Sequence, residues 1–146
     1  MTAKSTISDS GSERIKNLHP LYLIVGDRQV SPCDHETFGR FKLWVADKLT
    51  SGSIDIYATS EVSIGHWDGK ASDVFPYLLN PCECGTYLPI EIDPCPMFSS
   101  AVGLLTDLSR LNQHRDDMEP AFHPLVDSML AMANLSLEQN IALEIR

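Results

Sequence analysis

The residues of this chain whose types and spacing could do chemistry are four cysteines and two of the histidines. They are Cys33, His35, His66, Cys82, Cys84 and Cys95. Thiolate and imidazole groups brought together from separate segments are what a closed, tetrahedral zinc site requires. The pattern therefore predicts one structural zinc ion, held by four of these six side chains.

The strongest pair is Cys82 and Cys84, which are one residue apart and are followed by Gly85. A tight turn can aim two such thiolates at one ion, and a glycine after the pair can adopt a positive φ at little steric cost. The usual zinc knuckle places two residues between its cysteines. The single intervening residue here makes the match to a knuckle a moderate one.

Spacing alone does not select the other two ligands, and it leaves two candidate shells. Cys33 is the expected third ligand, and Cys95 completes the first candidate shell only if the chain after the paired cysteines bends back. The second shell replaces Cys95 with His35 or His66. Four free thiols are the main alternative to zinc, because unpaired cysteine is among the most buried residue types. In an oxidising compartment the same residues would form disulfides.

Enzyme motifs do not occur in the sequence. The zinc-deaminase pattern, the H-E-x-x-H helix, the G-x-S-x-G elbow and the phosphate-binding glycine loops all fail to match. A nucleophilic pair of Cys33 or Cys95 with His66, His114 or His123 can be drawn, but any chain with several cysteines and histidines allows such a pair. We therefore expect a non-enzymatic protein. A small metal- or thiol-dependent enzyme is the alternative.

The formal net charge of the 146 residues is −9, and it is concentrated late in the chain. From Glu83 to the C-terminus there are ten acidic and three basic residues. Such a surface repels phosphate groups, so we expect neither nucleic acid nor an anionic membrane as a partner. It suits a basic protein partner, although solubility alone is the simpler interpretation. Histidine and acidic residues at 114–123 could also hold a divalent metal, but a solvated acidic loop is the expected state.

The first 17 residues are polar and are expected to form a mobile tail before a single globular domain at 18–146. The tail lacks the apolar segment of a secretion signal, and no apolar run approaches the ~20 residues of a membrane span. These observations predict a cytoplasmic protein.

Periodicity predicts the elements of this domain. Extended segments are expected at 21–25, 54–57, 61–64 and 87–92. The pattern over 35–49 fits a helix with Asp34 as N-cap, although alternation at its centre also fits a strand. Turn signals are read at Gly26, at 66–69 and at the interruption by Pro32.

The C-terminal third changes to helical periodicity. Apolar residues after Ser100 recur every three or four positions, and a second helix begins near Pro120 or Pro124 and continues to Ile145. Strands early and helices late predict an α+β fold, in which a small, mostly antiparallel sheet is covered by two C-terminal helices. The last helix could also pack on another chain, including a second copy of this one.

The expected function follows from these features together. We expect a small acidic adaptor or accessory subunit that binds another protein and carries a structural zinc. The alternative is an acidic inhibitor of the immunity type, which neutralises a basic partner such as a nuclease.

Overall fold

The computed structural model describes residues 19–50, 54–58, 63–67, 74–79, 85–91 and 99–146. Its strands are β1 (Pro20–Val25), β2 (Arg28–Asp34), β3 (Ile54–Ala58), β4 (Ser63–Trp67), β5 (Thr86–Leu88), β6 (Ser99–Ser100) and β7 (Leu143–Ile145). Its helices are α2 (His35–Leu49), α4 (Ala101–Leu111), the 3-10 segments η1 (Asn112–Asp117) and η2 (Pro120–Phe122), and α5 (His123–Gln139). The expected tail at 1–17 lies outside the described residues.

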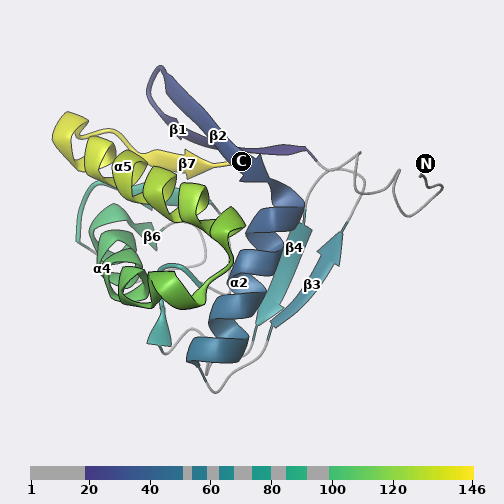
Figure 1. The fold of residues 1–146 in the computed structure, drawn as a ribbon. Coiled ribbons are helices and arrows are strands. Elements are labelled where there is room, and N and C mark those ends of the chain that lie inside the picture. The colour runs from purple at the N-terminus through teal and green to yellow at the C-terminus, as the bar shows by residue number, and fades with distance from the viewer. Residues whose placement is uncertain (1–18, 51–53, 59–62, 68–73, 80–84, 92–98) are drawn as a thin grey trace.

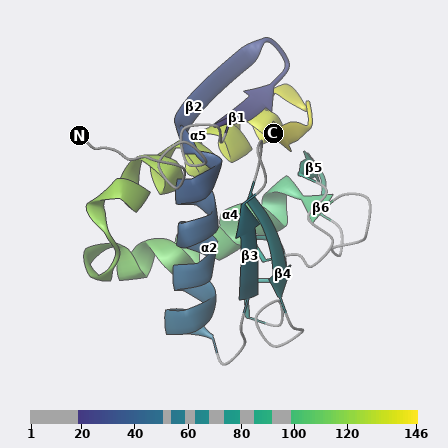
Figure 2. The same cartoon turned by 90° about the vertical axis from the view of Figure 1, so that its right-hand side faces the viewer.

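The architecture is α+β, as the sequence predicts. Five strands form a mixed sheet in the order β2-β1-β7-β5-β6, in which only the β5–β6 pair is parallel. Helices α4 and α5 pack together and cover this sheet, while α2 lies between them and a separate β3–β4 hairpin (Figures 1 and 2). Among the described helices, none is both long and apolar enough to cross a membrane.

Strand β1 and the turn after it are confirmed, whereas β2 was not expected. Gly26 adopts a φ of +61°, which a glycine reaches without strain. Pro32, read from the sequence as an interruption, lies within β2 at a shift in register opposite β1. Proline has no N–H to donate to a neighbouring strand. It is compatible with this position because β2 is an edge strand and the shift in register leaves Pro32 without a paired residue in β1.

The helical interpretation of 35–49 is confirmed, and the strand alternative is wrong. The backbone N–H of Thr37 donates to Oδ1 of Asp34 over 2.8 Å, which is the N-cap bond expected from the sequence. Helix α4 begins in the same way, with the N–H of Gly103 donating to Oγ of Ser100 over 3.0 Å. Both helix starts are thus fixed by local side-chain chemistry.

The end of the last helix differs from the prediction. Helix α5 stops at Gln139, and Asn140 takes a left-handed φ of 56°. Asparagine tolerates this conformation, and a left-handed cap ends the helix. Ile145 therefore belongs to strand β7, which pairs with both β1 and β5 and occupies the centre of the sheet.

The β3–β4 hairpin confirms the strand expected at 54–57 and corrects its partner. The second strand, expected at 61–64, is described over 63–67, and residues 61–62 lie outside the described residues. His66 therefore lies within β4, opposite Asp55, and not in the turn expected at 66–69. Strand β5 is shorter than expected because it stops at Leu88, directly before Pro89, which has no N–H for strand pairing.

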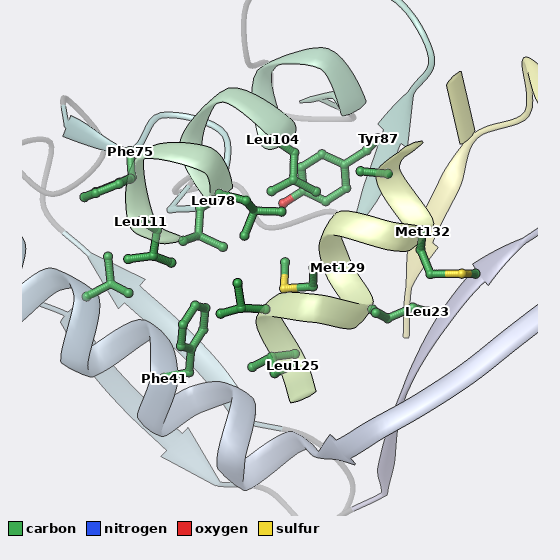
Figure 3. Close-up of a cluster of buried hydrophobic side chains, with 14 of the residues drawn as sticks. Leu23, Phe41, Phe75, Leu78, Tyr87, Leu104, Leu111, Leu125, Met129 and Met132 are labelled. Carbon is green, nitrogen blue, oxygen red and sulfur yellow. The ribbon is translucent and has the colours of Figure 1, made fainter. Parts of the chain in front are cut away.

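The hydrophobic core lies between the sheet and the helices. Side chains of several elements meet there, and Phe41 of α2, Leu104 of α4 and Met129 of α5 converge in one cluster (Figure 3). Ten of its members are labelled: Leu23, Phe41, Phe75, Leu78, Tyr87, Leu104, Leu111, Leu125, Met129 and Met132. This core fixes the position of α2 and of the turn between α4 and α5.

Candidate functional site

Of the six candidate zinc ligands, the structure describes the side chains of Cys33 and His35. His66 is placed only by its backbone in β4. The other three cysteines lie outside the described residues, so their role as ligands stays a prediction. Among the described residues, no group of three or more histidine, cysteine, aspartate or glutamate side chains could hold a metal ion.

Cys33 is half-buried in β2, where its backbone pairs with Leu21. Burial raises the pKa of its thiol to about 12, and the neighbouring Asp34 adds to the shift. Such a thiol is protonated at neutral pH, whereas a nucleophile or an unassisted metal ligand needs the thiolate. The environment of Cys33 therefore resembles that of a small apolar residue.

His35 is the first residue of α2 and is buried, with 8% of its surface exposed. Burial lowers the pKa of its imidazole, and a hydrogen bond with the backbone of Arg146 partly opposes that shift. Its own backbone N–H donates to the carbonyl of His19. These contacts join the start of α2 to the sheet, and they are the contacts of a structural histidine.

Gly85 is the first described residue after the paired cysteines. It adopts a φ of +80°, the conformation expected after a tight turn, and its carbonyl accepts the backbone N–H of Ile145 over 2.7 Å. Strands β1 and β7 lie between β2 and β5, which separates β2 from β5 by about 14 Å at the usual strand spacing. The side chain of Cys33 in β2 could bind a metal near Gly85 only if residues on the other side brought the metal across that distance.

Lys42 is a buried charged residue that the sequence analysis did not single out. It lies on the inner face of α2 with 2% of its surface exposed, and its Nζ is 4.3 Å from the centre of the Phe38 ring. Burial lowers the pKa of its ammonium group to about 7. A helical projection could have found it, because Lys42 falls between Phe38, Phe41 and Val45 on the apolar side of the helix.

Asp107 is a second buried charge, and its role is structural. Its Oδ2 accepts the backbone N–H groups of Tyr77 and Leu78 over 2.8 and 3.0 Å, and Arg110 lies 3.6 Å from Oδ1. Burial raises the pKa of this carboxyl, while the two backbone hydrogen bonds and Arg110 oppose the shift. Asp107 therefore anchors the segment at 74–79 to α4.

The acidic C-terminal third has its three arginines already engaged. Besides the Arg110 pair, Arg115 forms a two-pronged ion pair with Asp127, with contacts of 2.7 and 2.9 Å, and Arg146 pairs with Glu144. Arg115 thereby lowers the pKa of Asp127. The unneutralised charge of the described surface is consequently negative.

The turn between α4 and α5 carries part of that negative charge. Asp116 and Asp117 of η1 are exposed, and no described lysine or arginine lies within ion-pair distance of either carboxylate. His123 makes a 2.9 Å hydrogen bond between its Nε2 and the carbonyl of Arg115. The turn therefore combines exposed carboxylates with a histidine that already makes a backbone hydrogen bond, and its solvated state stays a prediction.

A side-chain network joins this turn to α2. Arg40 contacts Glu119 over 3.1 Å and Glu36 over 3.7 Å, and its guanidinium lies 5.6 Å from the centre of the buried Phe122 ring. Trp44 packs against the same ring, with 6.4 Å between the ring centres. The outer face of α2 and the acidic turn therefore form one continuous surface.

Comparison of the chain with models of protein families, with curated proteins and with solved structures finds no match. The functional argument consequently rests on the charge, burial and contacts described above.

Proposed function

We propose that this protein is an acidic accessory or adaptor protein that binds a basic protein partner. The observation that carries the proposal is the pairing of all three arginines after Glu83 with other acidic side chains, which leaves the exposed carboxylates of Asp116 and Asp117 without an ion pair among the described residues. A surface with one sign of charge steers an oppositely charged protein toward it and selects against anionic ligands.

Affinity purification from the native host tests this function. The tagged chain is expected to retain one basic protein at low salt and to release it near ~1 M salt, where the Debye length falls to about 3 Å. If the bound partner is an enzyme that loses activity in the complex, the protein is an inhibitor of the immunity type. Recovery of no basic partner, or of a partner insensitive to salt, would contradict the proposal.

We also propose a structural zinc ion near the start of β5, with Cys82 and Cys84 as two of its ligands and with Cys95 and His66 as the remaining candidates. The positive φ of Gly85 supports it, because that conformation suits the turn that would present the paired thiolates. The separation between β2 and β5 favours a shell without Cys33.

Elemental analysis of purified variants tests the zinc proposal. The wild-type chain and Cys33→Ser are expected to hold about one zinc per chain, and Cys82→Ser is expected to lose it, since a closed site needs all four ligands. Cys33→Ser is the matched control because it removes one thiol from a different strand. A metal-free wild-type chain, purified without chelators, would overturn the zinc proposal and leave the protein-binding proposal intact.

A further inference from the structure

The outer face of α2 carries a stripe of side chains that the core does not use. Glu36, Arg40, Leu43 and Asp47 recur at three- and four-residue steps, so they lie along one side of the helix. Leu43 exposes 43% of its surface, which makes it one of the exposed large apolar residues of the described chain. Trp44, partly buried beside it, adds an aromatic edge. The stripe therefore combines an apolar centre with charged ends.

The acidic turn extends this stripe on one side. The contact of Arg40 with Glu119 holds the turn against α2, and the two lie side by side in both views of the fold (Figures 1 and 2). Arg40 contacts both Glu36 and Glu119. Asp116 and Asp117 form no ion pair with a described lysine or arginine, and the neighbouring Arg115 is paired with Asp127 while it also attracts Asp116. The combined surface thus presents net negative charge around an exposed leucine.

We infer that this surface, consisting of the outer face of α2 and the turn at 116–119, docks an amphipathic basic segment of another protein. The inference rests on the proposed function and names the site and the partner chemistry. Lysine or arginine side chains of the partner would pair with Asp116 and Asp117 and would replace the 3.8 Å contact of Lys48 with Asp47, and an aliphatic side chain would cover Leu43. Charge complementarity supplies association rate and orientation, and a partly exposed tryptophan and a leucine supply the apolar contact.

A titration of the full-length, isotope-labelled protein with a synthetic helical peptide of lysine and leucine tests the inference. Backbone amide resonances over α2 and 112–122 are expected to shift, and those of the β1–β2 turn are expected to stay. An all-lysine peptide of equal charge is expected to bind about 10-fold more weakly, because it cannot cover Leu43. Equal affinity of the two peptides would contradict an apolar contact.

Matched variants separate the site from the overall charge. Asp116→Asn with Asp117→Asn, and separately Leu43→Ser, are each expected to weaken the lysine–leucine peptide about 5- to 10-fold. The controls are Asp27→Asn with Glu91→Gln, which removes the same charge elsewhere, and Ile90→Ser, which removes another exposed apolar residue. Controls that weaken binding as strongly would overturn the site but not the proposed function. Failure to bind either peptide would also overturn the site, while co-purification with a basic partner decides the function separately.

Discussion

The buried ammonium group of Lys42 makes the stability of this protein depend on pH in a defined direction. Burial lowers the pKa of Lys42 from 10.5 to about 7, so the folded chain loses this proton at a lower pH than the unfolded chain does. Between these two values the unfolded state binds more protons, and the free energy of unfolding therefore rises with pH. The stability gain is absent at lower pH, where both states are protonated.

The magnitude follows from the same two pKa values. Above pH 7 the slope approaches about 1.4 kcal/mol per pH unit, so the wild-type chain is expected to gain about 1–2 kcal/mol between pH 7 and 8.5. Among the other described groups, His35 and Cys33 have ordinary pKa values nearest this interval. The pKa of His35 is lowered from 6.5, so its contribution is largely complete by pH 7, and Cys33, raised from 9.0, lowers stability only as the pH approaches and passes 9.

Urea unfolding followed by tryptophan fluorescence, repeated across pH 7 to 8.5, measures this dependence. Lys42→Met keeps the length and most of the volume of the side chain but cannot titrate, so its stability is expected to be flat over the interval. Lys48→Met, on the exposed side of the same helix, is the control and is expected to keep the wild-type slope. A flat wild-type profile, or equal slopes in the wild type and Lys42→Met, would refute the burial of the charge.

Two further predictions concern the packing of the segment at 74–79. Gly103→Ala would place a Cβ in steric overlap with the ring of Tyr77, so it is expected to destabilise the fold by about 1–3 kcal/mol, while Ser109→Ala on the exposed side of α4 is nearly neutral. A thermal or urea midpoint of Gly103→Ala at or above that of the wild type would contradict the contact. Asp107→Ala removes the acceptor of two backbone N–H groups and is expected to cost about 2–4 kcal/mol, whereas Asp107→Asn keeps an acceptor oxygen and costs less. If Asp107→Ala and Asp107→Asn lose the same free energy of unfolding in urea, these hydrogen bonds do not govern the effect.

Local signals predicted the parts of the fold that depend on neighbouring residues. The caps at Asp34 and Ser100 and the turn at Gly26 each act through a few adjacent backbone atoms, so their positions could be read from the sequence. Strand β7 depends instead on pairing with β1 and β5, which lie far away in the chain. Ile145 of β7 lies, by coincidence, at a position that continues the helical spacing of α5. Periodicity alone therefore extends the predicted helix through Asn140.

The candidate site divides in the same way. The sequence identified the acidic excess and the residues at 114–123, but it could not show that each arginine of that region is already paired. It also gave no means to connect this turn with α2, because the contact of Arg40 with Glu119 joins residues far apart in the chain. The buried state of Lys42 follows from a helical projection, but the alternation of residues around it also fits a strand, in which Lys42 would face solvent.

The central claim is that exposed acidic side chains of this protein bind a basic protein partner. The measurement that tests it most directly is the salt dependence of the dissociation constant for the purified partner, compared between the wild type and Asp116→Asn with Asp117→Asn. We expect affinity that falls steeply with salt in the wild type and a shallower slope in the double variant. An affinity independent of salt in the wild type would contradict the claim.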